Sequence, residues 1–228
     1  MSRKAHLYVA STIAIGLLVL TSAVTSWQAG DVPRFLTYLV LAMVASTLKV
    51  RLPAIEATFS ADFVMILLAI AELGFGQTVV LASCCAVVQT SWNPEKLPSP
   101  SQLAFNVGNL AISSAAAYNL YHTAIGSLSG EYIVILLPFA ASIYFVANTL
   151  IVSGVLSILQ GRRVSDLWQK CFIWSFPYYL IGAAVTLWMT SANQRVSWRM
   201  SLLVLPLMYL AYVSYKLIVR QYGGSRTV

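Results

Sequence analysis

Charged residues are scarce in this chain of 228 amino acids. Only 9% of its residues are charged, whereas 59% are hydrophobic and the mean hydropathy is +0.77. Soluble domains usually carry about 25% charged residues. The composition therefore predicts a polytopic integral membrane protein, for which the lipid bilayer is the main partner. Because each span takes roughly 20 residues, we expect spans to occupy most of the chain and to leave no separate soluble domain.

Cysteine and histidine are also rare, which limits the chemistry that we expect. The three cysteines, Cys84, Cys85 and Cys171, fall in or beside apolar runs and show neither metal-ligand spacing nor a disulfide framework. The sequence contains no zinc-protease motif, no nucleophile elbow and no phosphate-binding loop. We therefore expect no enzymatic activity, no catalytic residue, no metal site and no cofactor.

The net charge of +7 has a simple explanation in a membrane protein. Lysine and arginine gather in cytoplasmic loops, and this bias sets the orientation of the chain in the bilayer. We therefore expect the positive charge to mark the cytoplasmic side and not to bind nucleic acid.

Apolar runs predict an all-α bundle of about eight transmembrane helices. The expected spans are 6–27, 35–50, 61–73, 77–92, 103–122, 132–159, 171–191 and 200–219. They form a single membrane domain over residues 1–228. The proline-rich loop 93–102 divides it into possible halves, 1–92 and 103–220.

Residues 61–92 decide the topology, because two apolar runs flank Gly74-Phe75-Gly76-Gln77. If this stretch crosses the membrane twice, eleven Lys and Arg residues are cytoplasmic and three (Arg34, Arg195 and Arg199) face out. A single crossing would leave six inside and eight outside. The charge bias favours two crossings, so we expect a short broken helical hairpin and cytoplasmic N- and C-termini.

Two carboxylates stand at the ends of the first apolar run of this hairpin, and such groups are costly in lipid. Glu72 is either a charged or protonatable group that lines a ligand cavity, or a helix end at the outer headgroup layer. For Asp62 the sequence favours a helix N-cap that also suits the helix dipole. A place in a pocket is the alternative.

Four amide side chains also lie in predicted spans: Gln89, Asn106, Asn109 and Asn148. Amides in hydrocarbon need partners, and hydrogen bonds between helices supply them. Structural packing is therefore favoured for this group. The alternative is that the amides converge with aromatic side chains on a small-molecule pocket.

Three stretches carry a family resemblance: Thr58–Asp62 through Glu72–Gly76, Ala104–Ala111, and Leu202–Tyr209 through Leu217. Together they resemble the N-terminal membrane domains of bacterial cyclic-di-GMP signalling proteins of the HD-GYP or GGDEF type. The resemblance implies a multi-pass sensor domain in the bacterial inner membrane. It also implies a small apolar or amphipathic ligand, and an output domain that would lie beyond Val228.

The pattern of a short helix, Gly-Phe-Gly and a second short helix is also similar to the substrate-binding S components of energy-coupling-factor transporters. Those proteins usually have six spans, whereas eight are expected here. The first functional hypothesis is a sensor or ligand-binding domain without its own catalytic output. The second is a transport protein for a small, vitamin-type solute. Either one could work as a homodimer or with a partner subunit, and a structural scaffold is a third reading.

Overall fold

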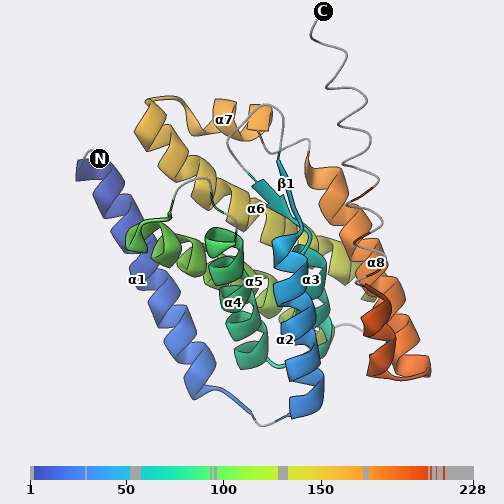
Figure 1. The fold of residues 1–228 in the computed structure, drawn as a ribbon. Coiled ribbons are helices and arrows are strands. Elements are labelled where there is room, and N and C mark those ends of the chain that lie inside the picture. The colour runs from blue at the N-terminus through green and yellow to red at the C-terminus, as the bar shows by residue number, and fades with distance from the viewer. Residues whose placement is uncertain are drawn as a thin grey trace, which may run out of the picture.

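The chain forms a bundle of helices with one short β-ribbon (Figure 1). The computed structural model describes residues 3–28, 30–51, 58–92, 94, 97–127, 133–171, 175–204, 206, 209 and 213. In chain order, the elements are α1 (Arg3–Thr25), α2 (Val32–Thr47), β1 (Lys49–Arg51), β2 (Thr58–Ser60), α3 (Phe63–Glu72), α4 (Phe75–Ser91), α5 (Pro100–Ser127), α6 (Ile133–Gln160), α7 (Val164–Cys171), α8 (Phe176–Arg195) and the 3-10 helix η3 (Trp198–Leu203). The all-α prediction is thus confirmed. Most of the span expected at 200–219 lies outside the described residues.

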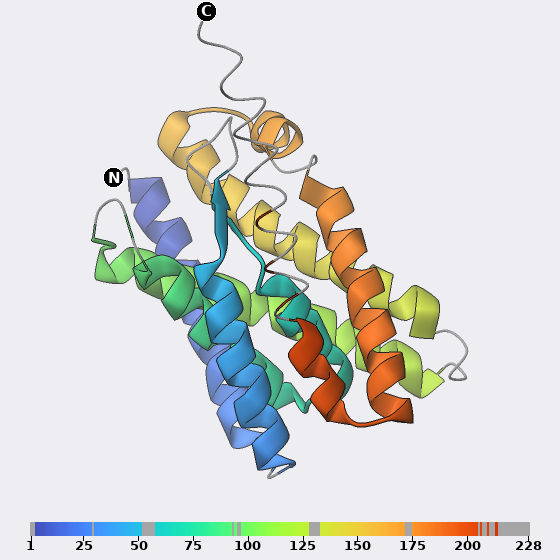
Figure 2. The ribbon, with the colours of Figure 1, turned by 45° about the vertical axis from the view of Figure 1, so that its right-hand side comes forward.

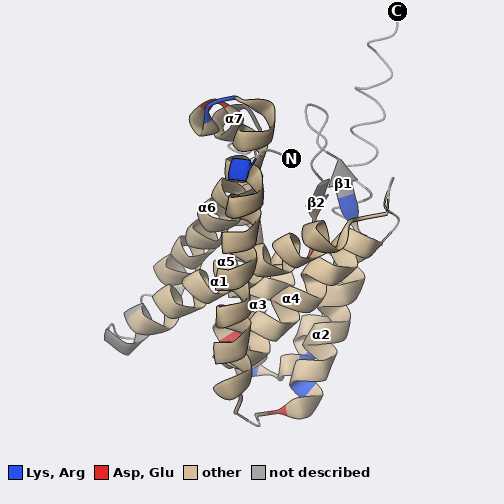
Figure 3. Ribbon diagram, turned by 90° about the vertical axis from the view of Figure 1, so that its left-hand side faces the viewer, with Lys and Arg blue, Asp and Glu red and all other residues tan. Residues whose placement is uncertain are grey.

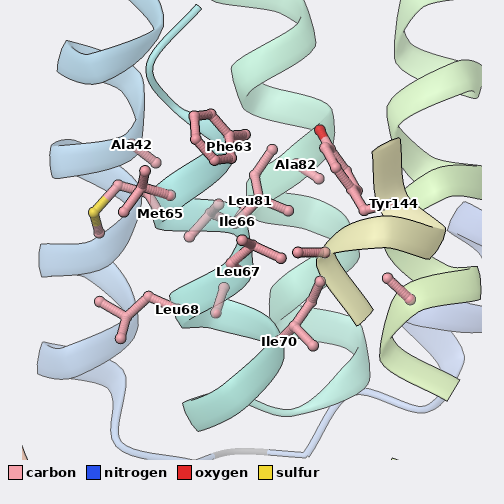
Figure 4. Close-up of a cluster of buried hydrophobic side chains, with 14 of the residues drawn as sticks. Ala42, Phe63, Met65, Ile66, Leu67, Leu68, Ile70, Leu81, Ala82 and Tyr144 are labelled. Atoms are coloured by element: carbon pink, nitrogen blue, oxygen red, sulfur yellow. The ribbon is translucent and has the colours of Figure 1, made fainter. Parts of the chain in front are cut away.

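Helix α3 is the centre of the bundle. Residues Phe63 to Ile70 are all buried, and a helix that is apolar all round needs neighbours on every side. Helices α2, α4, α5, α6 and α8 supply these neighbours. Figure 4 shows the α3 side chains pointing outward in several directions, with Met65 and Leu68 toward α2. The two ends of α3, with Asp62 and Glu72, are therefore held by several elements at once.

In the part of the chain that the structure describes, two helices are long and apolar enough to cross a membrane: Arg3–Thr25 and Val134–Gln160. Within the most apolar 18-residue stretch of Arg3–Thr25, only 17% of the residues are buried in the protein. Large apolar side chains also face outward on α2, α6 and α8. Outer surfaces of this kind suit a lipid environment better than water, while the number of spans stays a prediction.

The segment that carries Glu72 turns back on itself. Thr78 donates a hydrogen bond to the Ala69 carbonyl oxygen at 2.9 Å, and Gln89 donates one to Asp62. In an unbroken helix, 27 residues would separate the partners of the second bond by about 40 Å, at 1.5 Å per residue. The predicted helical hairpin is therefore present. Helix α3 itself is only about 15 Å long by the same measure.

The turn of this hairpin does not depend on glycine at position 74. Gly74 has φ −74° and ψ 164°, which any residue can adopt. A Cβ there would meet only Gln77 Oε1, at 3.9 Å. Gly76 differs, because its Cβ would lie 2.4 Å from the Ala23 carbonyl oxygen. Close packing of α4 on α1 therefore explains why position 76 is glycine. Neither crowding nor an unusual backbone conformation requires glycine at position 74.

Replacing Gly74 with serine should therefore be tolerated. Serine is a good N-cap residue, and Gly74 is the N-cap of α4. We expect a change in apparent unfolding free energy of less than about 0.5 kcal/mol, because the site is not crowded. Thermal unfolding in detergent, followed by circular dichroism, measures this. A large loss of stability would mean that the turn requires glycine after all.

Two short strands, which the sequence did not predict, join α2 to α3. Lys49 pairs with Ser60, Val50 with Phe59 and Arg51 with Thr58, in antiparallel register. The ribbon follows directly on α2 and leads into Asp62, so it fixes the start of α3. Figure 1 shows it at the same end of the bundle as the start of α1 and as α7.

Candidate functional site

A polar cluster surrounds Glu72 at the end of α3. Its other members are Arg34 and Tyr38 on α2, Asn193 on α8 and Ser201 on η3. Arg34 lies in the first turn of α2, where the Asp31 side chain caps the helix by accepting from the Arg34 backbone N–H at 3.1 Å. Tyr38 follows one helical turn later, so both side chains share a face. Figure 2 shows η3 between α2 and α8, where Ser201 can reach both helices.

The carboxylate of Glu72 accepts hydrogen bonds from three side chains. Arg34 forms a salt bridge with Oε2, and the Tyr38 hydroxyl donates to Oε2 at 2.6 Å. The Asn193 amide nitrogen lies 2.9 Å from Oε1 and 3.1 Å from Oε2. The Glu72 side chain is 5% exposed and that of Arg34 is 24% exposed. The charge is thus largely buried, and it is compensated by a cation and by neutral donors.

Ser201 completes the cluster by contacting both Tyr38 and Asn193. Its hydroxyl lies 2.8 Å from the Tyr38 hydroxyl and 2.7 Å from the Asn193 amide nitrogen. The Tyr38 hydroxyl uses its single hydrogen to donate a hydrogen bond to Glu72. The Ser201 hydroxyl therefore donates to Tyr38 and accepts from Asn193. Arg34 also lies over the Tyr38 ring, 5.6 Å from its centroid, within the range of a cation–π contact. The network thereby joins α2, α3, α8 and η3.

Two polar atoms of this cluster are buried and have no hydrogen-bond partner among the described residues: Arg34 Nε and Asn193 Oδ1. Buried polar groups are nearly always hydrogen-bonded, so each exception needs an explanation. One is a donor and the other an acceptor, so a ligand or water with both kinds of group would satisfy them.

A pocket of about 310 Å³ lies at the hairpin turn that follows Glu72. Its walls come from the end of α1, the turn between α3 and α4, and α5. The lining residues are Ser22, Ser26, Gln28, Gly74, Phe75, Gly76, Gln77 and Tyr118. None of them is charged, and they combine hydroxyl and amide groups with two aromatic rings. Such a lining suits a small, neutral, amphipathic ligand.

Asp62, at the other end of α3, is not the helix cap that the sequence favoured. It occupies the N-cap position, but its side chain makes no capping hydrogen bond. The carboxyl group is 2% exposed and contacts Ser46 on α2 and Gln89 on α4 instead. Contacts across the bundle thus replace the local cap, and a place in a pocket stays a prediction for Asp62.

The four amides expected in the spans do not converge on one pocket. Asn109 donates to Asn148 at 2.6 Å, which joins α5 to α6, and Asn106 donates to Thr90 at 2.9 Å, which joins α5 to α4. Gln89 bonds to Asp62. Each amide thus holds helices together, as the packing interpretation expects. A ligand-binding role for these residues stays a prediction.

Arg34, Tyr38, Asn193 and Ser201 were missed as members of a site. One signal was available: Arg34 was expected on the same side as Glu72, so an ion pair between them was possible. The contacts of Asn193 span 121 residues to Glu72 and 155 to Tyr38, and no local pattern marks them. Among the described residues, no group of three or more His, Cys, Asp and Glu side chains is arranged to hold a metal ion.

Comparisons with protein-family models, with curated proteins and with solved structures give no match.

Proposed function

We propose that the chain is a membrane-embedded sensor domain of about eight spans, in which a small amphipathic ligand binds beside the hairpin turn. The apolar outer faces of the helices support the membrane placement. The distribution of charge supports the orientation. Figure 3 shows basic residues at both ends of the bundle. More of them belong to the end with the start of α1, the ribbon and α7, which we assign to the cytoplasm of a bacterial cell.

One observation carries the sensor proposal: a single turn belongs both to the pocket and to the polar cluster. Gly74 lines the pocket, and Glu72, two residues before it, holds Arg34 and Asn193. A ligand that displaces the turn would therefore move the Glu72 carboxylate. Hydrogen bonds depend steeply on distance and angle, so a small movement would change the contacts to α8 and η3.

This arrangement gives a route from the pocket toward the C-terminal part of the chain. Ser201 and Asn193 lie in the last described elements, η3 and α8. A ligand shifts the equilibrium between two arrangements of the polar cluster only if it binds them with different affinities. In a second arrangement of the cluster, Arg34 Nε and Asn193 Oδ1, which have no partner among the described residues, would gain one.

Amide hydrogen exchange of the chain in nanodiscs of phosphatidylethanolamine and phosphatidylglycerol tests this proposal. The probes are octyl glucoside, which is neutral, decanoate and decyltrimethylammonium. Because the pocket lining carries no charge, only the neutral probe should protect the amides of residues 74–77. The same probe should change exchange in residues 193–203. Protection of the turn without any change in residues 193–203 would contradict a sensor.

A matched pair of variants tests whether octyl glucoside binds in the pocket or elsewhere on the protein. Ser22 lines the pocket and Thr21 does not, although both are exposed residues of α1. Ser22→Trp should fill the pocket and abolish the response to octyl glucoside, whereas Thr21→Trp should keep it. Loss of the response in both variants would show that the probe acts elsewhere. Counterflow of a labelled solute into vesicles would instead support transport and overturn the sensor proposal.

A further inference from the structure

The carboxyl group of Asp62 is a second polar site, at the opposite end of α3 from Glu72 and independent of the proposed sensing role. Ser46 contacts it from α2 at 2.9 Å and Gln89 contacts it from α4, both at Oδ2. Asp62 itself begins α3 and is 2% exposed. Three helices therefore meet at this single oxygen atom.

The number of hydrogens available for hydrogen bonds at this site bears on whether Asp62 is protonated. The Ser46 hydroxyl lies 2.8 Å from the Ala42 carbonyl oxygen and 2.9 Å from Asp62 Oδ2. A serine hydroxyl has one hydrogen to donate, and a carbonyl oxygen can only accept. If Ser46 donates to Ala42, the second short contact needs a hydrogen on Asp62. With an ionised Asp62, one of the two oxygen–oxygen contacts would have no hydrogen in it.

The surroundings of Asp62 are consistent with an uncharged acid. The titratable groups that face it are Cys85 on α4, Tyr144 on α6, and Tyr178 and Tyr179 on α8. Thiols and phenols are ordinarily neutral at pH 7, so none of them offers a positive charge.

Lys49 is a charged residue of β1, the strand that pairs with β2 just before Asp62. Its amine donates to the Trp92 carbonyl oxygen at 2.5 Å. The two side chains that contact Asp62 Oδ2, Ser46 and Gln89, are both neutral. An ionised carboxylate at a buried site with neutral partners carries a large desolvation cost.

We propose that Asp62 is a proton-binding site: the folded chain holds a proton on Oδ2, and this proton is donated to the Ser46 hydroxyl. The same oxygen accepts from Gln89, so the proton links α2 to α3 while the amide links α4 to α3. Loss of the proton would leave a charge facing the Ser46 oxygen. The contact that joins α2 to the start of α3 would then weaken.

Infrared spectroscopy of the wild-type chain at pH 7 in dodecyl maltoside, a detergent without carbonyl groups, gives the first test. Exposed carboxyl groups are ionised at this pH, so a carbonyl stretch of a protonated carboxylic acid should come from a buried group. We expect this band in the wild type and in Glu72→Gln, and we expect its loss in Asp62→Asn. Absence of the band from the wild type, or its presence in Asp62→Asn, would overturn the proposal.

Thermal unfolding gives a second and independent measurement. A folded state that binds more protons than the unfolded state loses stability as pH rises. The wild-type melting temperature should therefore fall between pH 6 and pH 9, and that of Asp62→Asn should fall less. Asparagine resembles the protonated acid in shape and does not ionise on unfolding, so the variant should melt at or above the wild-type temperature at pH 6. An Asp62→Asn chain that is already unfolded at pH 6 would contradict the protonated state.

Discussion

Replacing Glu72 with glutamine is expected to lower the free energy of unfolding by about 2–4 kcal/mol. Removal of one partner from a buried ion pair typically costs about 3–5 kcal/mol, because the remaining charge is left uncompensated. Arg34 keeps 24% of its side chain exposed, which reduces this penalty. The apparent melting temperature in detergent should fall by on the order of 10 °C.

A matched control for this variant is Asp31→Asn. Asp31 is a carboxylate at the same end of the bundle, but it is exposed and acts as the N-cap of α2. Asparagine caps a helix about as well as aspartate, so we expect a change below about 0.5 kcal/mol. Equal losses in the two variants would show that Glu72 contributes no more than an exposed charge.

A double-mutant cycle isolates the contribution of the pair. Arg34→Gln alone should be destabilising, because it leaves the Glu72 carboxylate with only neutral donors, Tyr38 and Asn193. Combined with Glu72→Gln, it should cost less than the sum of the two single changes, by about 1–3 kcal/mol, since both charges are then absent. Strict additivity would mean that Arg34 and Glu72 do not interact in the membrane.

Hydropathy was sufficient to predict α1 to α6, α8 and the hairpin break, but not the short helix α7. The span expected at 132–159 corresponds to α6 at Ile133–Gln160, and the break at residues 74–77 falls where α3 ends and α4 begins. Both features depend on long apolar runs and on a local change in composition, which a sequence displays directly. The two-stranded ribbon was missed, because three residues per strand give almost no periodic signal.

The partners of the two carboxylates could not be predicted in the same way. For Asp62, the local pattern favoured a helix cap, but burial selected Ser46 and Gln89 in place of the cap. For Glu72, one partner comes from α8, 121 residues away. Such contacts follow from how the helices pack, and a single sequence contains no record of which helices are neighbours. Only the cost of a charge in lipid marked these residues in advance.

The second large effect is expected at the crossing of α1 and α5. A Cβ added to Gly16 would lie 2.3 Å from the Gly108 Cα, so the obstacle is backbone, which cannot rotate away. Small residues at such crossings let helices approach closely in lipid. Gly16→Ala should therefore force the two helices apart.

We expect Gly16→Ala to lower the free energy of unfolding by about 1–3 kcal/mol, the usual range for overpacking. Alanine is the better helix former by about 1 kcal/mol, so propensity alone would predict the opposite sign. Ala14→Leu is the control, because Ala14 is an exposed residue of the same helix, and this larger change should alter stability by less than about 0.5 kcal/mol. Thermal unfolding of the three chains in one detergent separates these outcomes. A Gly16→Ala chain as stable as the wild type would mean that α1 does not pack this closely on α5, and a more stable one would mean that helix propensity governs this position.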